Sequence, residues 1–278
     1  MAGVQRSLRD ALSIVGREAL RIVLPSWCVA CDSELPWRDR TASCCGKCWA
    51  AMARIEGAKC VSCALPLAGE WLSVIGSQVS APHGDAARTT DRQPATSLHP
   101  PTTFLCLECE TNPLPVAWTD AWGEYRGPLE RVLHALKFAR HDFLDDALSG
   151  LLEQTLRARG DLAFDAITAV PMRASRERER GYNQAELLGR ALGRRTGLHC
   201  DMTLLQRRGE RATQSTLPKR ERAANVRGAF AASSRVKGRS ILLVDDICTT
   251  GETLRACATA LRDAGAARVC AITVAKAS

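Results

Sequence analysis

Aromatic residues and long apolar runs are both scarce in this 278-residue sequence. Phe, Trp and Tyr together make up 5% of it, which weighs against a surface that binds single-stranded nucleic acid mainly by stacking bases. No stretch approaches the ~18 consecutive apolar residues that a membrane-spanning helix requires. Arg17, Glu18 and Arg21 interrupt the apolar positions of residues 8–24, so we do not expect a secretory signal. We therefore expect a soluble, cytoplasmic protein with an amphipathic helix over residues 1–25.

A common nucleotide-binding motif is also missing. The sequence contains no G-x-x-x-x-G-K-[ST], the loop with which P-loop enzymes cradle the phosphates of a nucleoside triphosphate. This argues against a P-loop hydrolase.

Positive charge is abundant but unevenly distributed. The formal net charge is +8, and nearly all of the surplus lies between Arg173 and Arg239. Such an excess suits phosphorylated ligands or a nucleic-acid backbone, although any single arginine in the run could belong to a solvated basic face.

Cysteine is the most informative residue type present. Eight of the 13 cysteines form C-x-x-C pairs, which are Cys28 with Cys31, Cys45 with Cys48, Cys60 with Cys63, and Cys106 with Cys109. Two such turns supply the four thiolates that a structural Zn²⁺ site uses, so four pairs predict two structural zinc ions. We pair the first turn with the second and the third with the fourth, while an interleaved pairing stays open. Cys44 is an alternative ligand to Cys45.

The sequence divides into two parts. Residues 26–118 are predicted to form a double zinc-ribbon module, with a disordered insertion at residues 76–103 that is rich in Ser, Thr, Pro, Ala and Gly. From residue 119 onward, short apolar strands alternate with helical stretches. Helices are expected at 129–139, 144–158, 184–196 and 252–264, and strands at 166–170, 241–244 and 268–274. This alternation predicts an α/β domain with a parallel sheet over residues 119–278, whose ligand lies at the carboxyl ends of the strands.

The stretch ILLVDDICTTGET, residues 241–253, carries the main functional signal. Asp245 and Asp246 are expected to close a buried strand, where carboxylates can accept hydroxyl hydrogen bonds or bind a cation. The following turn opens a helix, whose free N–H groups favour an anion. A ligand with a sugar diol and a phosphate, accompanied by Mg²⁺, satisfies both halves. A structural alternative is a capping box, in which Thr249 caps the helix and Glu252 reaches back.

Residues 244–253 resemble the signature of type I phosphoribosyltransferases, and the wider chain resembles the ComF family. The matching segments are Tyr125-Arg126-Gly127, Leu136-Lys137-Phe138, Val170-Pro171, Arg180-Gly181-Tyr182-Asn183-Gln184, Gln214, Arg220, Asn225 and Gly228-Ala229-Phe230. The resemblance covers nearly the whole length.

The resemblance implies that the site binds phosphoribosyl pyrophosphate (PRPP) with Mg²⁺. Asp245 and Asp246 would hold the ribose hydroxyls and serve as the catalytic residues. The turn that would hold the 5′-phosphate consists of Thr249, Thr250, Gly251, Glu252 and Thr253. The resemblance places the pyrophosphate beside the segment after Val170-Pro171.

Guanidinium groups pair well with phosphate oxygens, so Arg173, Arg176 and Arg180 are candidates for the pyrophosphate. Each could equally be a solvated helix residue. Asn183 and Gln184 could orient the ligand or cap the next helix. Lysines on amphipathic helices usually face water, which makes Lys137 a lesser candidate.

Two functions follow from the resemblance. The first is a PRPP-binding, phosphoribosyltransferase-like protein linked to DNA uptake and natural competence; if it is an enzyme, a nitrogen nucleophile of unknown identity displaces pyrophosphate from C1 of PRPP. Because the chain begins MAGV and lacks a processed N-terminal Cys, we do not expect a glutamine-using version. The alternative is a non-catalytic accessory protein of natural competence, which would bind single-stranded DNA during DNA uptake and keep PRPP as a regulator or relic.

Overall fold

The computed structural model describes residues 27–36, 43–67, 104–138, 144–208 and 228–277. The predicted N-terminal helix (1–25) and the insertion at 76–103 lie outside these ranges. So do Gln214, Arg220 and Asn225.

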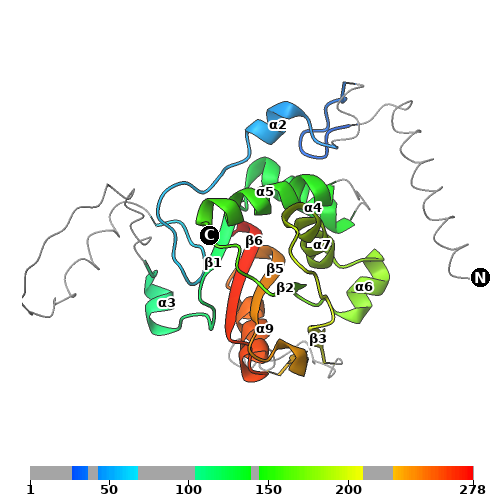
Figure 1. The fold of residues 1–278 in the computed structure, drawn as a ribbon. Helices are drawn as coiled ribbons and strands as arrows, with labels where there is room; N and C mark the ends of the chain where they lie inside the picture. Colours follow the sequence, from blue (N-terminus) through cyan, green and yellow to red (C-terminus); the bar gives the residue numbers. More distant parts are fainter. Residues whose placement is uncertain (1–26, 37–42, 68–103, 139–143, 209–227, 278) are drawn as a thin grey trace, which may run out of the picture.

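A four-stranded, fully parallel sheet forms the centre of the molecule (Figure 1). Its spatial order is β1, β6, β5, β2. The strands are β1 (Thr119–Glu124), β2 (Ala166–Ala169), β5 (Ser240–Cys248) and β6 (Arg268–Lys276). A two-stranded antiparallel ribbon pairs β3 (Leu205–Arg207) with β4 (Phe230–Ala232).

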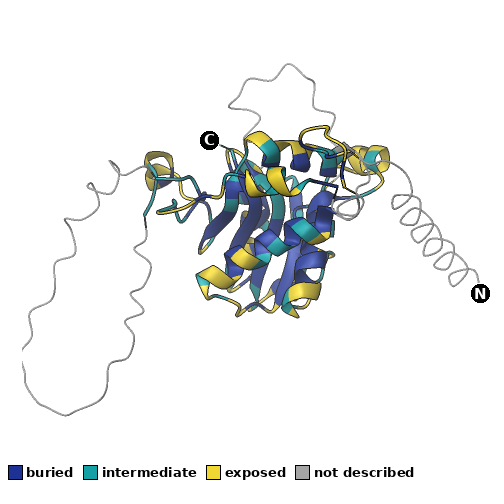
Figure 2. Ribbon diagram, turned by 90° about the horizontal axis from the view of Figure 1, so that it is seen from above, coloured by how far each residue is buried: buried dark blue, intermediate teal, exposed yellow. Residues whose placement is uncertain are grey.

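Helices cover both faces of this sheet, as the sequence predicted for an α/β domain. The helices are α4 (Gly127–Phe138), α5 (Leu144–Arg159), α6 (Ala174–Arg180), α7 (Gln184–Thr196) and α9 (Glu252–Asp263). Short helices α2 (Gly46–Ala50) and α3 (Leu107–Thr111) belong to the cysteine-rich part, and a 3-10 turn, η3 (Ser234–Val236), precedes β5. Seen from above, buried residues fill the sheet and the inner faces of the helices, whereas the exposed residues lie on the outer faces (Figure 2).

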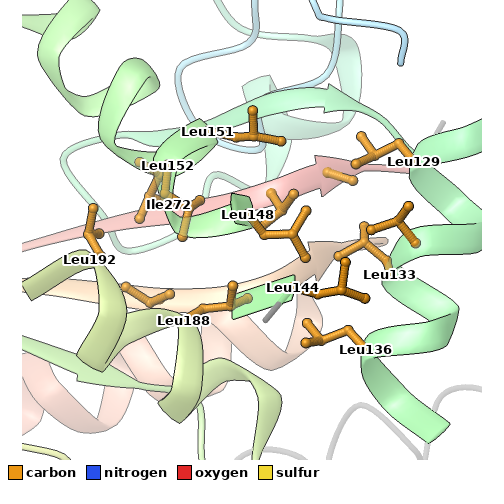
Figure 3. Packing of buried hydrophobic residues seen from close by; sticks show 14 of the residues in the cluster. Leu129, Leu133, Leu136, Leu144, Leu148, Leu151, Leu152, Leu188, Leu192 and Ile272 are labelled. Carbon is orange, nitrogen blue, oxygen red and sulfur yellow. The ribbon is translucent and has the colours of Figure 1, made fainter. Parts of the chain in front are cut away.

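Alternation along β5 shows how the sheet separates two cores. Leu242 and Val244 pack with leucines of α4, α5 and α7, some of which are drawn in Figure 3. Ile241 and Leu243 pack on the other face, against α9 and the β3–β4 ribbon. A strand that is buried on both faces reads as a continuous apolar run, which explains the sequence ILLV.

The observed elements agree with most of the sequence predictions, but the strand before the acids is longer than expected. We expected the strand to end at Val244, with Asp245 and Asp246 outside it. Instead β5 continues to Cys248, because Asp245 to Cys248 stay in parallel register with Thr273 to Lys276 of β6. The two acids therefore lie on a sheet strand, whose backbone pairing fixes their positions.

No described helix is long and apolar enough to cross a membrane.

Candidate functional site

Two acids and four arginines line one pocket at the carboxyl end of the sheet. Strands β2 and β5 are neighbours, with Ala169 opposite Val244. The segment that follows β2 therefore lies beside Asp245 and Asp246. The pocket has a volume of about 410 Å³, and its lining includes Asp245, Asp246, Arg173, Arg176, Arg180, Asn183 and Thr253. Residues separated by about 70 positions in the sequence thus meet where parallel α/β sheets bind their ligands.

The acid pair is electrostatically unfavourable when nothing is bound. Burial and the neighbouring charge of Asp246 raise the pKa of Asp245 well above the ordinary range of an aspartate. The Asp245 carboxylate accepts a hydrogen bond from the backbone N–H of Asp246 at 2.9 Å. The Asp246 carboxylate lies 3.1 Å from the Nζ of Lys137. Since carboxylate oxygens are preferred Mg²⁺ ligands, this pair fits a divalent cation or a sugar diol.

Lys137 and Arg207 also line this pocket; the sequence offered Lys137 only as a lesser candidate and did not identify Arg207. Lys137 comes from α4, and its ion pair with Asp246 turns it away from the water-facing position that its helix pattern suggested. Arg207 ends β3 and stacks over the ring of Phe230 at 4.9 Å. Both residues reach the pocket through tertiary packing; Lys137 lies in a segment that resembles the family, whereas Arg207 has no local sequence signal.

The arginine-rich segment 173–180 forms one side of the pocket. Arg173 is the N-cap residue of α6, which ends at Gly181 with a left-handed φ of 83°. Arg173 and Arg176 are exposed, whereas Arg180 is partly buried. The structure therefore brings the three predicted arginines to the acid-lined pocket. Their guanidinium groups give that side a positive charge.

The first turn of α7 forms part of the pocket wall. Asn183 caps this helix, because its Oδ1 accepts the N–H of Ala185 at 3.1 Å and its Nδ2 donates to the carbonyl of Val170 at 3.0 Å. The capping alternative thus accounts for Asn183. Gln184 is buried, and its Nε2 has no hydrogen-bond partner among the described residues. A buried donor without a partner costs about 1–3 kcal/mol, which a ligand acceptor in the pocket could offset.

The hydroxyl-glycine turn, residues 249–251, differs from the predicted capping box. Helix α9 begins at Glu252, and its N-cap is Gly251, with φ at 79° and no side-chain cap. Thr249 therefore does not cap the helix, and that prediction was wrong. Its carbonyl instead accepts a hydrogen bond from the buried ammonium group of Lys276.

The residues of this turn do not all face the acid-lined pocket. Among the five residues of 249–253, only Thr253 lines it. Glu252 lines a separate pocket of about 770 Å³, and its carboxylate lies 3.5 Å from Arg255 Nε. The carboxylate of Glu252 is thus directed away from the acids.

The eight paired cysteines form two groups of four. One contains Cys28, Cys31, Cys45 and Cys48, and the other contains Cys60, Cys63, Cys106 and Cys109; within each group all sulfurs lie within 4.8 Å of one another. Sulfurs at the corners of a tetrahedron with ~2.3 Å Zn–S bonds are about 3.8 Å apart. The Cys31–Cys45 and Cys63–Cys106 sulfur distances are 3.9 Å and 3.7 Å, so both groups fit a zinc ion.

Cys60, inside a group of four, and Cys44, outside both groups, differ in how readily their thiols bind metal. A hydrogen bond from Cys63 lowers the pKa of Cys60 to about 4, which favours the thiolate form that metal ligation requires. Cys44 lies outside both groups of four. Burial raises the pKa of the Cys44 thiol to about 12, so this thiol stays protonated.

These features define a class of protein. A parallel sheet with an acid pair and a hydroxyl-glycine turn at its carboxyl end, joined to two four-cysteine groups, is a phosphoribosyltransferase-type domain with a double zinc ribbon. Family models agree, since the one described as "Phosphoribosyl transferase domain" matches residues 182–278 and the one described as "Double zinc ribbon domain" matches residues 19–78.

Named relatives identify the family more closely. The DNA utilization protein YhgH of Escherichia coli O157:H7 is 35% identical over 223 residues, which cover 76% of this chain and 93% of the relative. Competence protein F of Haemophilus influenzae is 32% identical over 150 residues, covering 51% of this chain and 66% of that protein. Among solved structures, a glutamine PRPP amidotransferase from B. subtilis matches with a TM-score of 0.35 and 20% identity, covering 50% of this chain and 30% of that chain. The chain belongs to the ComF family.

Proposed function

We propose that the acid-lined pocket binds PRPP with Mg²⁺. The observation that supports this most is the opposite chemistry of its two walls, with Asp245 and Asp246 on one and Arg173, Arg176 and Arg180 on another. In this proposal the acids hold the ribose hydroxyls and the metal, and the arginines meet the pyrophosphate. The N–H groups of the hydroxyl-glycine turn and the first turn of α9 receive the 5′-phosphate. That region comprises the proposed binding residues Thr249, Thr250, Gly251, Glu252 and Thr253.

Calorimetry with PRPP and Mg²⁺ tests this assignment. The wild type should bind, and Asp245→Asn/Asp246→Asn should bind much more weakly, because a neutral amide pair loses the charge that attracts the cation. Asp263→Asn is a matched control, since Asp263 lies at the far end of α9 and does not line this pocket. Equal binding by the wild type and the double variant would reject the assignment.

The two four-cysteine groups complete the proposal as structural zinc sites, one ion in each. Four thiolates leave no open coordination position, so the metal would stabilise the ribbons rather than take part in chemistry. We place the ribbon module at residues 26–118 and the phosphoribosyltransferase-like domain at residues 119–278.

If the protein is an enzyme, the reaction is a transfer of the phosphoribosyl group. A nitrogen nucleophile attacks C1, the C1–O bond to pyrophosphate breaks, and the nucleophile loses its proton. The carboxylates of Asp245 and Asp246 would stabilise the positive charge that develops on the ribose. Release of pyrophosphate during a screen of amines and nucleobases would identify the acceptor.

The relatives' names support a role in the uptake or use of DNA, which we propose takes place in the cytoplasm. Several are called DNA utilization protein, and others are called competence protein. The exposed arginines of α6 support direct contact with a phosphate backbone as a second candidate function. A gel shift with single-stranded DNA should then show binding at ~50 mM salt that weakens steeply as salt rises. If no binding occurs at low salt, direct contact with DNA is rejected.

A further inference from the structure

The hydroxyl-glycine turn contacts the residues around the second cysteine group, which consists of Cys60, Cys63, Cys106 and Cys109. Just before the turn, the buried thiol of Cys248 donates to the carbonyl of Cys63 at 3.6 Å. At the end of the turn, Gly251 is so close to Leu114 that a Cβ built on it would lie 3.3 Å from a Leu114 methyl group. Leu114 packs in one buried cluster with Cys60, Cys63 and Cys109. The turn thus rests directly on the residues that surround the second group of sulfurs.

Arg255 ties the next turn of α9 to the same ribbon. Its two terminal nitrogens donate to the backbone carbonyls of Asn112 and Pro113, at 2.7 Å and 2.6 Å. Its backbone N–H also donates to the carbonyl of Gly251 at 2.8 Å. One residue therefore connects the ribbon segment 112–114 with the start of α9. Hydrogen bonds from a charged donor are stronger than neutral ones, so this connection is a firm one.

The ribbon segment is in turn fixed by the cysteine turn. The N–H of Leu114 donates to the hydroxyl of Ser62 at 2.7 Å, and Ser62 lies between Cys60 and Cys63. A change in the shape of this cysteine turn would therefore pass through Ser62 and Leu114 to Gly251. The physical path has two contacts and involves only buried or partly buried groups.

The first cysteine group has no comparable contact with the hydroxyl-glycine turn among the described residues. Its polar tie to the α/β part is a hydrogen bond from Arg131, on α4, to the carbonyl of Ala30 at 2.6 Å. Arg131 does not line the acid-lined pocket. The short helices of the two ribbons, α2 and α3, accordingly lie at different places around the sheet (Figure 1). The first cysteine group can therefore serve as a control for the second, because it has the same four thiols at a different place in the fold.

We propose that the second cysteine group is a structural part of the 5′-phosphate site, and that Arg255 is the positioning residue that joins the two. This inference rests on the proposed function, because it concerns how the PRPP site is held in shape. Metal bound at the second group would keep Asn112 to Leu114 in place, and these residues would hold the N–H groups of the turn toward the phosphate. Loss of metal at the second group should then weaken binding of 5-phosphoribosyl ligands, whereas loss at the first group should not.

The test compares two arginines of the same helix in the full-length protein. Arg262 also donates to two backbone carbonyls, those of Ala266 and Ala267, but both acceptors lie beyond the C-terminal end of α9. We expect Arg255→Met to weaken ribose 5-phosphate binding about fivefold or more, a typical size for coupling between sites. Its affinity for Mg²⁺-pyrophosphate should not change, because that ligand uses the arginine side of the pocket. Arg262→Met should bind both ligands like the wild type.

Each outcome of this calorimetric experiment decides something different. If Arg255→Met binds ribose 5-phosphate as well as the wild type, the inference is wrong. It is also wrong if both variants lose affinity equally, or if Arg255→Met loses pyrophosphate as well, since a general loss of stability would explain either result. A wild type that binds neither PRPP nor ribose 5-phosphate would instead overturn the proposed function.

A second pair of variants tests the role of the metal. Cys109→Ser and Cys48→Ser each remove one sulfur from a different group. Both should lower the zinc content measured by atomic emission, but only Cys109→Ser should weaken ribose 5-phosphate binding. Equal affinities in two variants that have each lost zinc would overturn the inference.

Discussion

Asp245 shows at the residue scale how a binding site can reduce the stability of the fold. Burial and the charge of Asp246 raise its pKa, so the folded protein holds this proton more tightly than the unfolded chain does. The stability that this proton provides is complete below the unfolded pKa and is lost as the pH rises through the folded pKa. The acid pair therefore makes the unliganded protein less stable at neutral pH than in acid.

Replacing Asp245 by Asn should raise stability while removing ligand binding. We expect the Tm of unliganded Asp245→Asn at pH 7 to rise by about 2–4 °C, which corresponds to ~1 kcal/mol in a chain of this size. The gain should disappear below about pH 4, where the wild-type carboxyl is protonated in the unfolded chain as well as in the folded protein. Thermal unfolding followed by circular dichroism across this pH range measures both effects.

Asp201 provides a control of opposite sign. Burial opposes its ionisation, but hydrogen bonds from Thr203 and the nearby charge of Arg235 lower its pKa overall. Asp201→Asn should therefore lose stability at pH 7, and that loss should shrink as the pH falls below the ordinary aspartate pKa. A lower Tm for Asp245→Asn at pH 7 would contradict this account of the acid pair.

Gln184, like Asp245, is a polar residue that lines the acid-lined pocket, and its side chain is buried. Its amide nitrogen has no partner among the described residues, so Gln184→Met should cost no stability and could add about 1 kcal/mol. If the amide donates to the ligand, the same variant should bind Mg²⁺-pyrophosphate several-fold more weakly. Gln154→Met is the control, because Gln154 accepts a hydrogen bond from Trp122 away from the pocket. Unchanged pyrophosphate affinity in Gln184→Met would exclude a ligand contact by this side chain.

At the scale of elements, the periodicity of apolar residues predicted the helices. It did not predict strands that form only because they pair with another strand. Helix α7 was expected at residues 184–196 and is observed there, because its apolar positions recur at helical spacing and a capping Asn precedes it. Strand β1 (TDAWGE) carries no such signal. It becomes a strand because β6 pairs with it. The β3–β4 ribbon was missed for the same reason, since each of its strands has three residues.

The site could be predicted as far as it is contiguous in sequence. The acids and the hydroxyl-glycine turn follow one another, so their chemistry is legible without a structure. Lys137 and Arg207 come from other elements, and only tertiary packing brings them to the pocket. The capping box is absent for a related reason: the carbonyl of Thr249 accepts a hydrogen bond from Lys276, and Gly251 rather than Thr249 is the N-cap of α9.

The start of α9 leads to a prediction about this element. Gly251 has a left-handed backbone and contacts Leu114, so Gly251→Ala should lose about 1–2 kcal/mol of stability from backbone strain. It should also weaken ribose 5-phosphate binding, because the crowded Cβ would displace the turn. Gly197→Ala is a matched control, since Gly197 has a similar φ of 75° and open space around it. Denaturant unfolding and calorimetry of both variants would separate strain from displacement; equal ligand affinities would contradict the predicted displacement.

At the scale of the whole molecule, the two cysteine groups connect the ribbon module to different parts of the α/β sheet. The first contacts α4, which carries Lys137 on its last turn. The second contacts the start of α9 through Arg255. Both elements reach the acid-lined pocket, Lys137 directly and α9 through Thr253. Both groups therefore pack on the α/β domain, but among the described residues only the second contacts the hydroxyl-glycine turn, so loss of metal at the first group should leave the 5′-phosphate site intact.

The metal content of the whole chain gives the last prediction. Cys45 caps α2 and its sulfur lies 3.9 Å from that of Cys31, whereas the adjacent Cys44 is buried outside the group, with its pKa raised to about 12. Native mass spectrometry should therefore find two zinc ions per wild-type chain, two in Cys44→Ser and one in Cys45→Ser. Because the two residues are neighbours, general disruption of the ribbon would affect both variants alike. Loss of a zinc ion from Cys44→Ser but not from Cys45→Ser would show that Cys44 is the ligand.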